Sequence, residues 1–396
     1  MIRFESLSAR EWPDPHTTRP HILPIYATSS YDFEDIQQGI RIFANEEKGH
    51  TYGRYGNPTV EATASKIAAM ETFGSEMNAA AVMTNSGMAA VNVLVSGLLK
   101  QGDKILTQPN VYGGTTELLT KIVTGWGIEI MYANLNDLEL VSSVLKNDPS
   151  IRLVYLETPA NPTLACIDIE ALAKVVSAHQ RWSAIDNTFA TPYLQQPLLL
   201  GVDFVIHSTT KFINGHGNSI SGIVLGKDPE LFRDRIWNTM KLTGANCSPF
   251  EAWLVYQGMK TLPLRMDKHC SNALLVATTL SNHPNVRRVN YPGLESHPDH
   301  QIAKKQMRAY GGMMSFELEG GIETALKAMN KLKFCSLAPT LGDVDTLILH
   351  PASSSHLKVD PDTRRNAGIS DGLIRISVGI EDPQDILDDL LQAIDN

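Results

Sequence analysis

Two polar segments near the middle of the chain combine residue types that can carry out amine chemistry. Asp186 ends the apolar run 181–186, and Ser208-Thr209-Thr210-Lys211 follows the apolar run 202–208. A lysine amine can form a Schiff base, an aspartate can keep a pyridine nitrogen protonated, and hydroxyl groups can bind a phosphate. This combination suits pyridoxal 5′-phosphate (PLP), with Lys211 as the Schiff-base lysine and Asp186 as the partner of the ring nitrogen.

A third segment, Ser86-Gly87-Met88, begins a helical pattern after a polar turn. The first backbone N–H groups of a helix and its dipole favour an anion at that end. We therefore expect the amides of Gly87 and Met88 to bind the cofactor phosphate, together with the hydroxyls of Ser208 and Thr210.

Each of these residues also has an ordinary structural interpretation. An aspartate at a strand end is often a turn former, and a single lysine is usually solvated, so it is the combination that indicates a site. Ser208 and Lys211 also match the SxxK pattern of serine acyl-enzymes, although the chain lacks the SDN and KTG boxes that accompany it. A serine acyl-enzyme therefore remains the remote alternative.

The elements that must position these residues alternate between short apolar runs and helical patterns. Strands separated by helices of this length predict βαβ units and a largely parallel sheet, whose ligands lie at the carboxyl ends of the strands. The predicted strands cover residues 103–108, 127–133, 151–157, 181–186, 202–208 and 219–226, and the predicted helices cover residues 87–99, 114–123, 135–145 and 169–179.

The remainder of the chain predicts two further regions. Residues 1–60 are rich in proline and weakly periodic, which is typical of an extended arm. Residues 61–250 would form the large cofactor-binding domain. Residues 251–396 would form a smaller α/β domain, beginning with a long helical region at 249–282 and containing apolar runs at 314–318, 346–349 and 373–378 before a helix near 383–394.

Composition excludes several classes of protein. The chain has 396 residues, 43% of them hydrophobic, which is enough to build substantial cores. Its 34 Lys and Arg against 43 Asp and Glu give a formal net charge of −9, which argues against nucleic-acid binding. No apolar stretch approaches the roughly 20 residues needed to span a bilayer, and the first residues lack a signal-peptide pattern. The four cysteines show no metal-ligand spacing, so we expect no metal and a cytoplasmic location.

Seven segments together resemble the Cys/Met-metabolism (trans-sulfuration) family of PLP-dependent enzymes. They are TYGRYGNPT (51–59), NSGMAA (85–90), VYGGT (111–115), ETPANPT (157–163), DNTFATPYLQQP (186–197), HSTTKFINGHG (207–217) and RISVGIEDPQDILDDL (375–390). The resemblance covers essentially the whole chain. It implies an α/β fold of the aspartate-aminotransferase type (fold type I), with a mostly parallel seven-stranded sheet, and a homotetramer built from two active dimers.

The resemblance also implies further roles for individual residues. Tyr112 would stack on the cofactor ring and assist proton transfer. Tyr52 and Arg54 match the pair that a neighbouring subunit contributes to the phosphate. Arg375 matches the arginine that binds the substrate α-carboxylate, with Asn161 and Ser336 assisting near it.

Within this family the segments favour some substrates over others. The loop 336–347 lacks the Glu-Ser-Leu-Gly-Gly pattern of cystathionine enzymes and is closer to methionine γ-lyases and O-acetylhomoserine sulfhydrylases. Gly114, however, stands where methionine γ-lyases usually carry cysteine. We expect γ-elimination of methionine or homocysteine-type amino acids to 2-oxobutyrate, ammonia and a thiol. The alternative is γ-replacement on O-acetyl- or O-succinylhomoserine, by a sulfhydrylase or a cystathionine γ-synthase.

Overall fold

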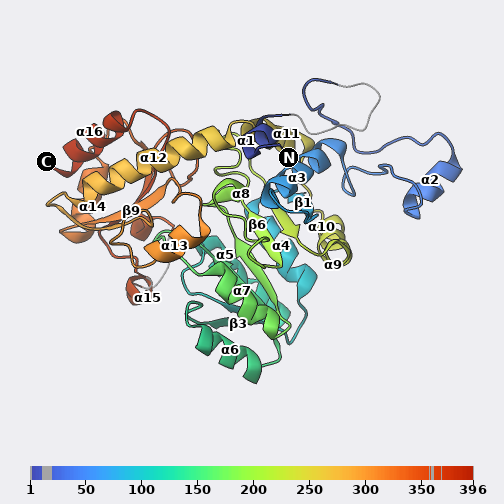
Figure 1. Cartoon of the computed structure of the whole chain (residues 1–396), viewed down its shortest axis with the longest axis horizontal. Coiled ribbons are helices and arrows are strands. Elements are labelled where there is room, and N and C mark those ends of the chain that lie inside the picture. Colours follow the sequence, from blue (N-terminus) through green and yellow to red (C-terminus); the bar gives the residue numbers. More distant parts are fainter. Residues whose placement is uncertain (1, 11–19, 356, 358–360, 367, 396) are drawn as a thin grey trace.

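The computed structural model describes residues 2–10, 20–355, 357, 361–366 and 368–395 (Figure 1). Its larger sheet has seven strands in the order β1-β7-β6-β5-β4-β2-β3. Five neighbouring strands run parallel, whereas β7 is antiparallel to both of its neighbours, which confirms the mostly parallel sheet. The strands are β1 (Ala80–Thr84), β2 (Lys104–Thr107), β3 (Glu129–Tyr132), β4 (Ile151–Glu157), β5 (Trp182–Asp186), β6 (Phe204–His207) and β7 (Gly222–Gly226).

Both faces of this sheet are covered. Along β4, Leu153 and Tyr155 belong to one apolar cluster, and Val154 and Leu156 belong to another, as expected for a parallel sheet between two layers of helices. The four predicted crossover helices are confirmed as α4 (Gly87–Leu98), α5 (Gly113–Lys121), α6 (Leu138–Asn147) and α7 (Ile169–Ala178). Helix α6 begins later than predicted because the Asp137 side chain accepts from Leu140 N and caps the helix there.

A second sheet of five strands, in the order β10-β11-β12-β9-β8, lies in the C-terminal part of the chain (Figure 1). Its strands are β8 (Val286–Asn290), β9 (Met313–Leu318), β10 (Ser336–Leu337), β11 (Leu347–Leu349) and β12 (Leu373–Ser377). The sequence indicated β9, β11 and β12. It did not indicate β8, because Arg287 and Arg288 interrupt the apolar pattern and are exposed.

The helical region predicted at 249–282 consists of two helices, α11 (Pro249–Met259) and α12 (Leu262–Ser281). Pro263 lies in the first turn of α12, where its missing N–H costs nothing, so the sequence itself begins a new helix there. Val255, Met259 and Met266 pack into the core of the larger sheet, whereas the core of the second sheet draws on α12 from Ala273 onward. The domain boundary near 250 therefore stays a prediction.

The N-terminal arm is less extended than predicted, because it contains α1 (Phe4–Ala9) and α2 (Ile36–Phe43) before α3 (Pro58–Glu71) begins. Asp35 accepts from Gln38 N and starts α2, a cap that the weak periodicity of the region concealed. Helix α2 projects away from the body of the chain (Figure 1). Its apolar side chains Ile36, Ile40 and Phe43 are 68%, 61% and 63% exposed.

Smaller helices complete the chain: α8 (Thr191–Leu194), α9 (Pro229–Leu231), α10 (Asn238–Thr243), α13 (His300–Gln306), α14 (Gly321–Met329), α15 (Pro361–Asn366) and α16 (Pro383–Ile394). Helix α16 coincides with the predicted closing helix. Among the described residues, every helix is too short or too polar to span a lipid bilayer.

Candidate active site

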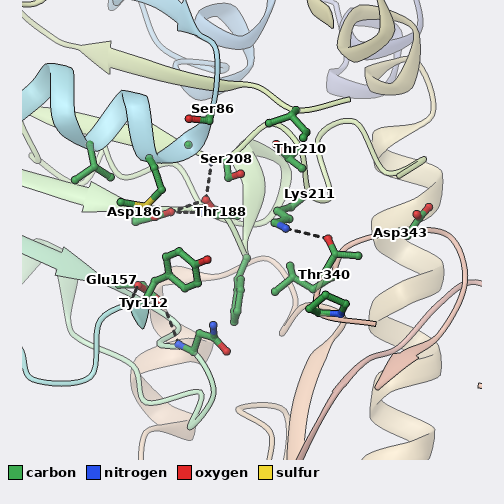
Figure 2. Close-up of a pocket in the computed structure, with 18 of the residues that line it drawn as sticks. Ser86, Tyr112, Glu157, Asp186, Thr188, Ser208, Thr210, Lys211, Thr340 and Asp343 are labelled. Carbon is green, nitrogen blue, oxygen red and sulfur yellow. Dashed lines mark hydrogen bonds between the residues drawn. The ribbon is translucent and has the colours of Figure 1, made fainter. Parts of the chain in front are cut away.

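A cavity of about 440 Å³ lies where β4, β5 and β6 end, between the two sheets. The strands run parallel, so their last residues meet at one edge, as the sequence predicted. Lys211, Asp186 and Tyr112 all line this cavity, and the C-terminal part of the chain closes it with Thr340 and Arg375. Figure 2 shows Lys211, Asp186, Tyr112 and Thr340 lying around the cavity from separate segments.

Lys211 lies in the turn after β6. Its Nζ donates to Thr340 Oγ1 at 2.9 Å, an interaction drawn in Figure 2. Burial, with the Arg375 cation adding to it, lowers the pKa of Lys211 from 10.5 to about 8. A substantial fraction of this amine is therefore unprotonated slightly above neutral pH, which is the form that reacts as a nucleophile or base.

Asp186 ends β5, and its Oδ1 accepts from Thr188 N at 3.0 Å and from Thr188 Oγ1 at 2.5 Å. Burial raises the pKa of this carboxyl above its usual value. Within the described part of the chain, no lysine or arginine forms an ion pair with Asp186. A cationic ring nitrogen in the cavity would supply the missing partner.

Glu157, at the end of β4, is a site residue whose role sequence reasoning missed. Its Oε2 accepts from Tyr112 N at 2.6 Å and its Oε1 accepts from Asn161 N at 2.9 Å. Burial and the facing Asp186 carboxylate raise the pKa of Glu157 to about 8. The available signal was its position: Glu157 ends a predicted strand, as Asp186 does, and the two are register neighbours.

Arg375 lies in the middle of β12 and is 3% exposed. Its Nη2 donates to Thr340 O at 2.9 Å and its Nη1 donates to Asn161 Oδ1 at 3.4 Å. Its Nε is buried and has no partner among the described residues. Burial lowers the pKa of Arg375 to about 10, which still leaves the guanidinium charged at neutral pH. The unpaired N–H suits a bound carboxylate.

The phosphate end of the cavity lies at the start of α4. Ser86 caps the helix by accepting from Ala89 N at 3.0 Å, which leaves the Gly87 and Met88 amides without helical carbonyl partners. A Cβ on Gly87 would lie 2.7 Å from Ser208 Cβ, so only glycine lets these segments approach so closely. The Thr210 hydroxyl, by contrast, already exchanges hydrogen bonds with the backbone of Ser221.

Comparison with known proteins places this geometry in a family. Residues 6–395 match the family model for Cys/Met metabolism PLP-dependent enzymes. The chain belongs to this family. It is 46% identical to an L-methionine gamma-lyase of Fusobacterium nucleatum subsp. polymorphum over 94% of this chain and 93% of that protein. It is 38% identical to an O-succinylhomoserine sulfhydrylase of Pseudomonas aeruginosa over 99% and 95% of the two chains.

The solved structures agree with this assignment. The crystal structure of a cystathionine gamma-lyase from Lactobacillus plantarum, complexed with L-serine, superposes with a TM-score of 0.91, at 38% identity over 100% of this chain and 99% of that one. The Cys/Met-metabolism enzymes are PLP-dependent, which confirms the predicted cofactor and the fold type I expectation. The cavity fits that cofactor: it offers an amine at Lys211, an unpaired carboxylate at Asp186 and free helix amides at Gly87 and Met88.

The serine acyl-enzyme alternative is wrong. Membership of the PLP-dependent family excludes it, and the Lys211 amine donates to Thr340, with no hydrogen bond to Ser208 among the described side chains. Thr340 itself was not singled out from the sequence. Its hydroxyl accepts from the Lys211 amine while its carbonyl accepts from Arg375, so it links two predicted site residues.

Three predicted site residues lie outside the cavity. Ser336 is exposed on the edge strand β10 and does not line the cavity, where Thr340 occupies the position near Arg375. Tyr52 is 43% exposed, and Arg54 donates to Lys241 O at 2.5 Å beside the Tyr55 ring. The roles of Tyr52, Arg54 and Ser336 therefore stay predictions.

Proposed function

We propose that the chain is a PLP-dependent C–S lyase that converts L-methionine or homocysteine-type amino acids to 2-oxobutyrate, ammonia and a thiol. The observation that carries this proposal is the charge distribution in the cavity. Lys211 and Arg375 are the only cationic side chains among the described residues that line it, and the remaining lining includes Phe189, Ile220 and Leu341. Once Arg375 binds the α-carboxylate, apolar side chains are left for a neutral thioether.

The same lining disfavours a second negative charge on the substrate. Asp343 contributes a carboxylate to the cavity wall, and no further described cation is available there to bind the distal carboxylate of a succinyl ester. The named activity of the Fusobacterium relative supports the same assignment. The second candidate is γ-replacement on an acylhomoserine, which the Pseudomonas sulfhydrylase relative and the glycine at position 114 favour.

The chain's own residues account for the proton transfers that elimination needs. When bound, PLP withdraws electrons from the substrate α-carbon. Arg375 holds the α-carboxylate, and Asp186 keeps the ring nitrogen positively charged. The Lys211 amine would remove the α-proton, give that proton up to the bound cofactor and then, as a base again, remove a β-proton; a pKa of about 8 suits these transfers. Tyr112 donates a proton to the departing sulfur.

We further propose that the chain works in the cytoplasm as a homotetramer of two active dimers. The exposure of Tyr52 and α2 in a single chain supports this assembly, because the arm reaches away from its own body (Figure 1). A neighbouring subunit could then receive Tyr52 and Arg54 at its phosphate end.

A substrate panel tests the proposed reaction. The purified holoenzyme is incubated with methionine, homocysteine, cystathionine and the acetyl and succinyl esters of homoserine, with and without sulfide or cysteine. We expect 2-oxobutyrate from methionine without an added nucleophile. Turnover only of an acylhomoserine, and only with a thiol present, would overturn the lyase assignment in favour of γ-replacement.

A further inference from the structure

We propose that Glu157 is a positioning residue that holds Tyr112 at the leaving-group end of the cavity. This inference rests on the proposed function, in which Tyr112 donates a proton to the departing sulfur. Glu157 acts through the backbone of Tyr112, since the Glu157 carboxylate contacts the Tyr112 N–H and not its phenol.

The Tyr112 side chain has little else to fix it. Its ring is 43% exposed, and its phenol makes no hydrogen bond to another described residue. Tyr112 precedes α5 as the N-cap residue but provides no side-chain cap. The Tyr112 backbone, from which the phenol extends, is held by the hydrogen bond of 2.6 Å from Tyr112 N to Glu157 Oε2 and by the bond of 3.0 Å from Thr116 N to Tyr112 O. Figure 2 shows Tyr112 beside Glu157 and facing the cavity.

Glu157 fastens both ends of the loop that carries Tyr112. At the other end, Gln108 Nε2 donates to Glu157 O at 2.9 Å, and Glu157 N donates to Gln108 Oε1 at 3.2 Å. The residues between Gln108 and Tyr112 are thus held at two points by one residue of β4. A shift of about 1 Å in a reacting group can cost on the order of 10²-fold in rate.

The second carboxylate oxygen of Glu157 serves the opposite side of the substrate. It accepts from Asn161 N at 2.9 Å, and Asn161 Oδ1 in turn accepts from Arg375 Nη1 at 3.4 Å. The carboxylate therefore bonds directly to the Tyr112 backbone and only indirectly, through Asn161 and a contact of 3.4 Å, to Arg375, which Thr340 O also holds. The two N–H donors favour the ionised form of Glu157 and so oppose the burial and the Asp186 charge that raise its pKa. Glutamine, with its single carbonyl oxygen, could accept from only one of the two N–H groups.

Burying this carboxylate next to Asp186 is electrostatically unfavourable, as the raised pKa of Glu157 shows. Perturbed carboxyls of this kind concentrate at functional sites. If Glu157 only connected two loops, its carboxyl would not need to lie beside Asp186, the proposed partner of the cofactor nitrogen. We therefore attribute the unfavourable burial of the Glu157 carboxylate to its role in positioning Tyr112.

The test separates the α-proton step, which uses Lys211, from the step that uses Tyr112. Glu157→Gln holoenzyme is compared with wild type for exchange of the substrate α-proton in deuterated buffer and for release of 2-oxobutyrate. We expect 2-oxobutyrate release to fall by about 30-fold or more, while α-proton exchange changes by less than about threefold. Equal losses in both measurements would overturn the proposal, because a merely structural defect would affect both.

A double variant tests whether Glu157 acts through Tyr112, whatever the size of the loss in Glu157→Gln alone. If Glu157 acts through Tyr112, then Glu157→Gln should have little further effect in a Tyr112→Phe background. Multiplicative losses in Tyr112→Phe/Glu157→Gln would contradict the proposal. Asn110→Ala is the matched control on the same loop, since it removes only a 3.5 Å contact to Thr163, and it should keep elimination within about twofold.

A second substitution covers the case in which Glu157→Gln does not fold. Glu157→Asp keeps the charge but shortens the reach by one methylene, so it should show the same selective loss in a milder form. An unchanged ratio of elimination to exchange in Glu157→Asp would overturn the proposal. Failure of the proposed function would be visible separately, because the wild-type enzyme would then not eliminate methionine. In that case the ratio of elimination to α-proton exchange is measured on the substrate that the panel identifies.

Discussion

Lys211, Thr340 and Arg375 are hydrogen-bonded to one another within one chain, whereas Tyr52 and the apolar side chains of α2 in the N-terminal arm are exposed. Arg375 is 3% exposed and Lys211 contacts Thr340, which in turn accepts from Arg375. In the arm, Tyr52 is 43% exposed, and Ile36, Ile40 and Phe43 of α2 are each more than 60% exposed. The contrast agrees with the proposal that Tyr52 and Arg54 of the arm act at the site of a neighbouring subunit.

The largest effect is expected from a substitution in the buried site around Lys211. Lys211→Ala removes the amine that binds the cofactor and moves the protons, so we expect turnover to fall by at least about 10⁴-fold. Steady-state release of 2-oxobutyrate and the visible absorbance of bound PLP measure the loss. Lys174→Ala, which removes a surface lysine paired with Glu170, is the control and should remain active. Retained turnover in Lys211→Ala would contradict the assignment.

A smaller loss is expected when the carboxylate partner is removed. Arg375→Gln should raise KM for the amino acid by about 100-fold, because a buried charge-assisted pair would be lost. The corresponding amine without a carboxylate should bind wild type and variant equally well. An equal change for both ligands would show that Arg375 supports the fold and does not bind the carboxylate. Arg287→Gln, at an exposed ion pair, is the control.

The arm can be tested by mixing two inactive variants. Arg54→Ala should impair the site of the neighbouring subunit, and Lys211→Ala impairs its own. Mixed dimers of the two would contain one intact site, so random pairing should restore about one quarter of wild-type turnover. Activity that stays at the level of the separate variants after refolding together would indicate that Arg54 serves its own chain or none.

The smallest expected effect is a pH dependence of the rate at which the Lys211 amine reacts with PLP. Because burial lowers the pKa of Lys211 to about 8, the reactive neutral amine becomes available as pH rises through 8 and not through 10.5. Reconstitution of the apoenzyme with PLP should therefore accelerate by about tenfold between pH 7 and pH 9 and level off. A rate still rising steeply above pH 9 would show that the Lys211 amine is not perturbed.

The sequence indicated the fold through strands whose apolar runs and crossover helices follow simple periodicity, and β4, β5 and β6 were found as predicted. It did not indicate β8, where the consecutive Arg287 and Arg288 interrupt the apolar pattern, or α2, which depends on the Asp35 cap. Local patterns identify elements that bury an apolar face, and they are weaker for elements that remain exposed in one chain.

The candidate site shows the same division. Lys211, Asp186 and Arg375 were expected at the site because each occupies a motif or a strand position with a chemical purpose, and all three line one cavity. Thr340 and Glu157 were missed because their importance lies in contacts between segments far apart in the sequence. Ser336 was expected from the resemblance and stays a prediction, and Thr340 was not singled out because no local pattern tells which residue of that loop turns toward Arg375.

The most direct test of the account is to locate the cofactor on the chain. The holoenzyme is treated with borohydride, which reduces a Schiff base to a stable amine, and its peptides are mapped by mass spectrometry. We expect the pyridoxyl group on the peptide that contains Lys211 and on no other lysine. Labelling of a different lysine, or none in an enzyme that retains PLP and activity, would contradict the assignment of this cavity as the active site.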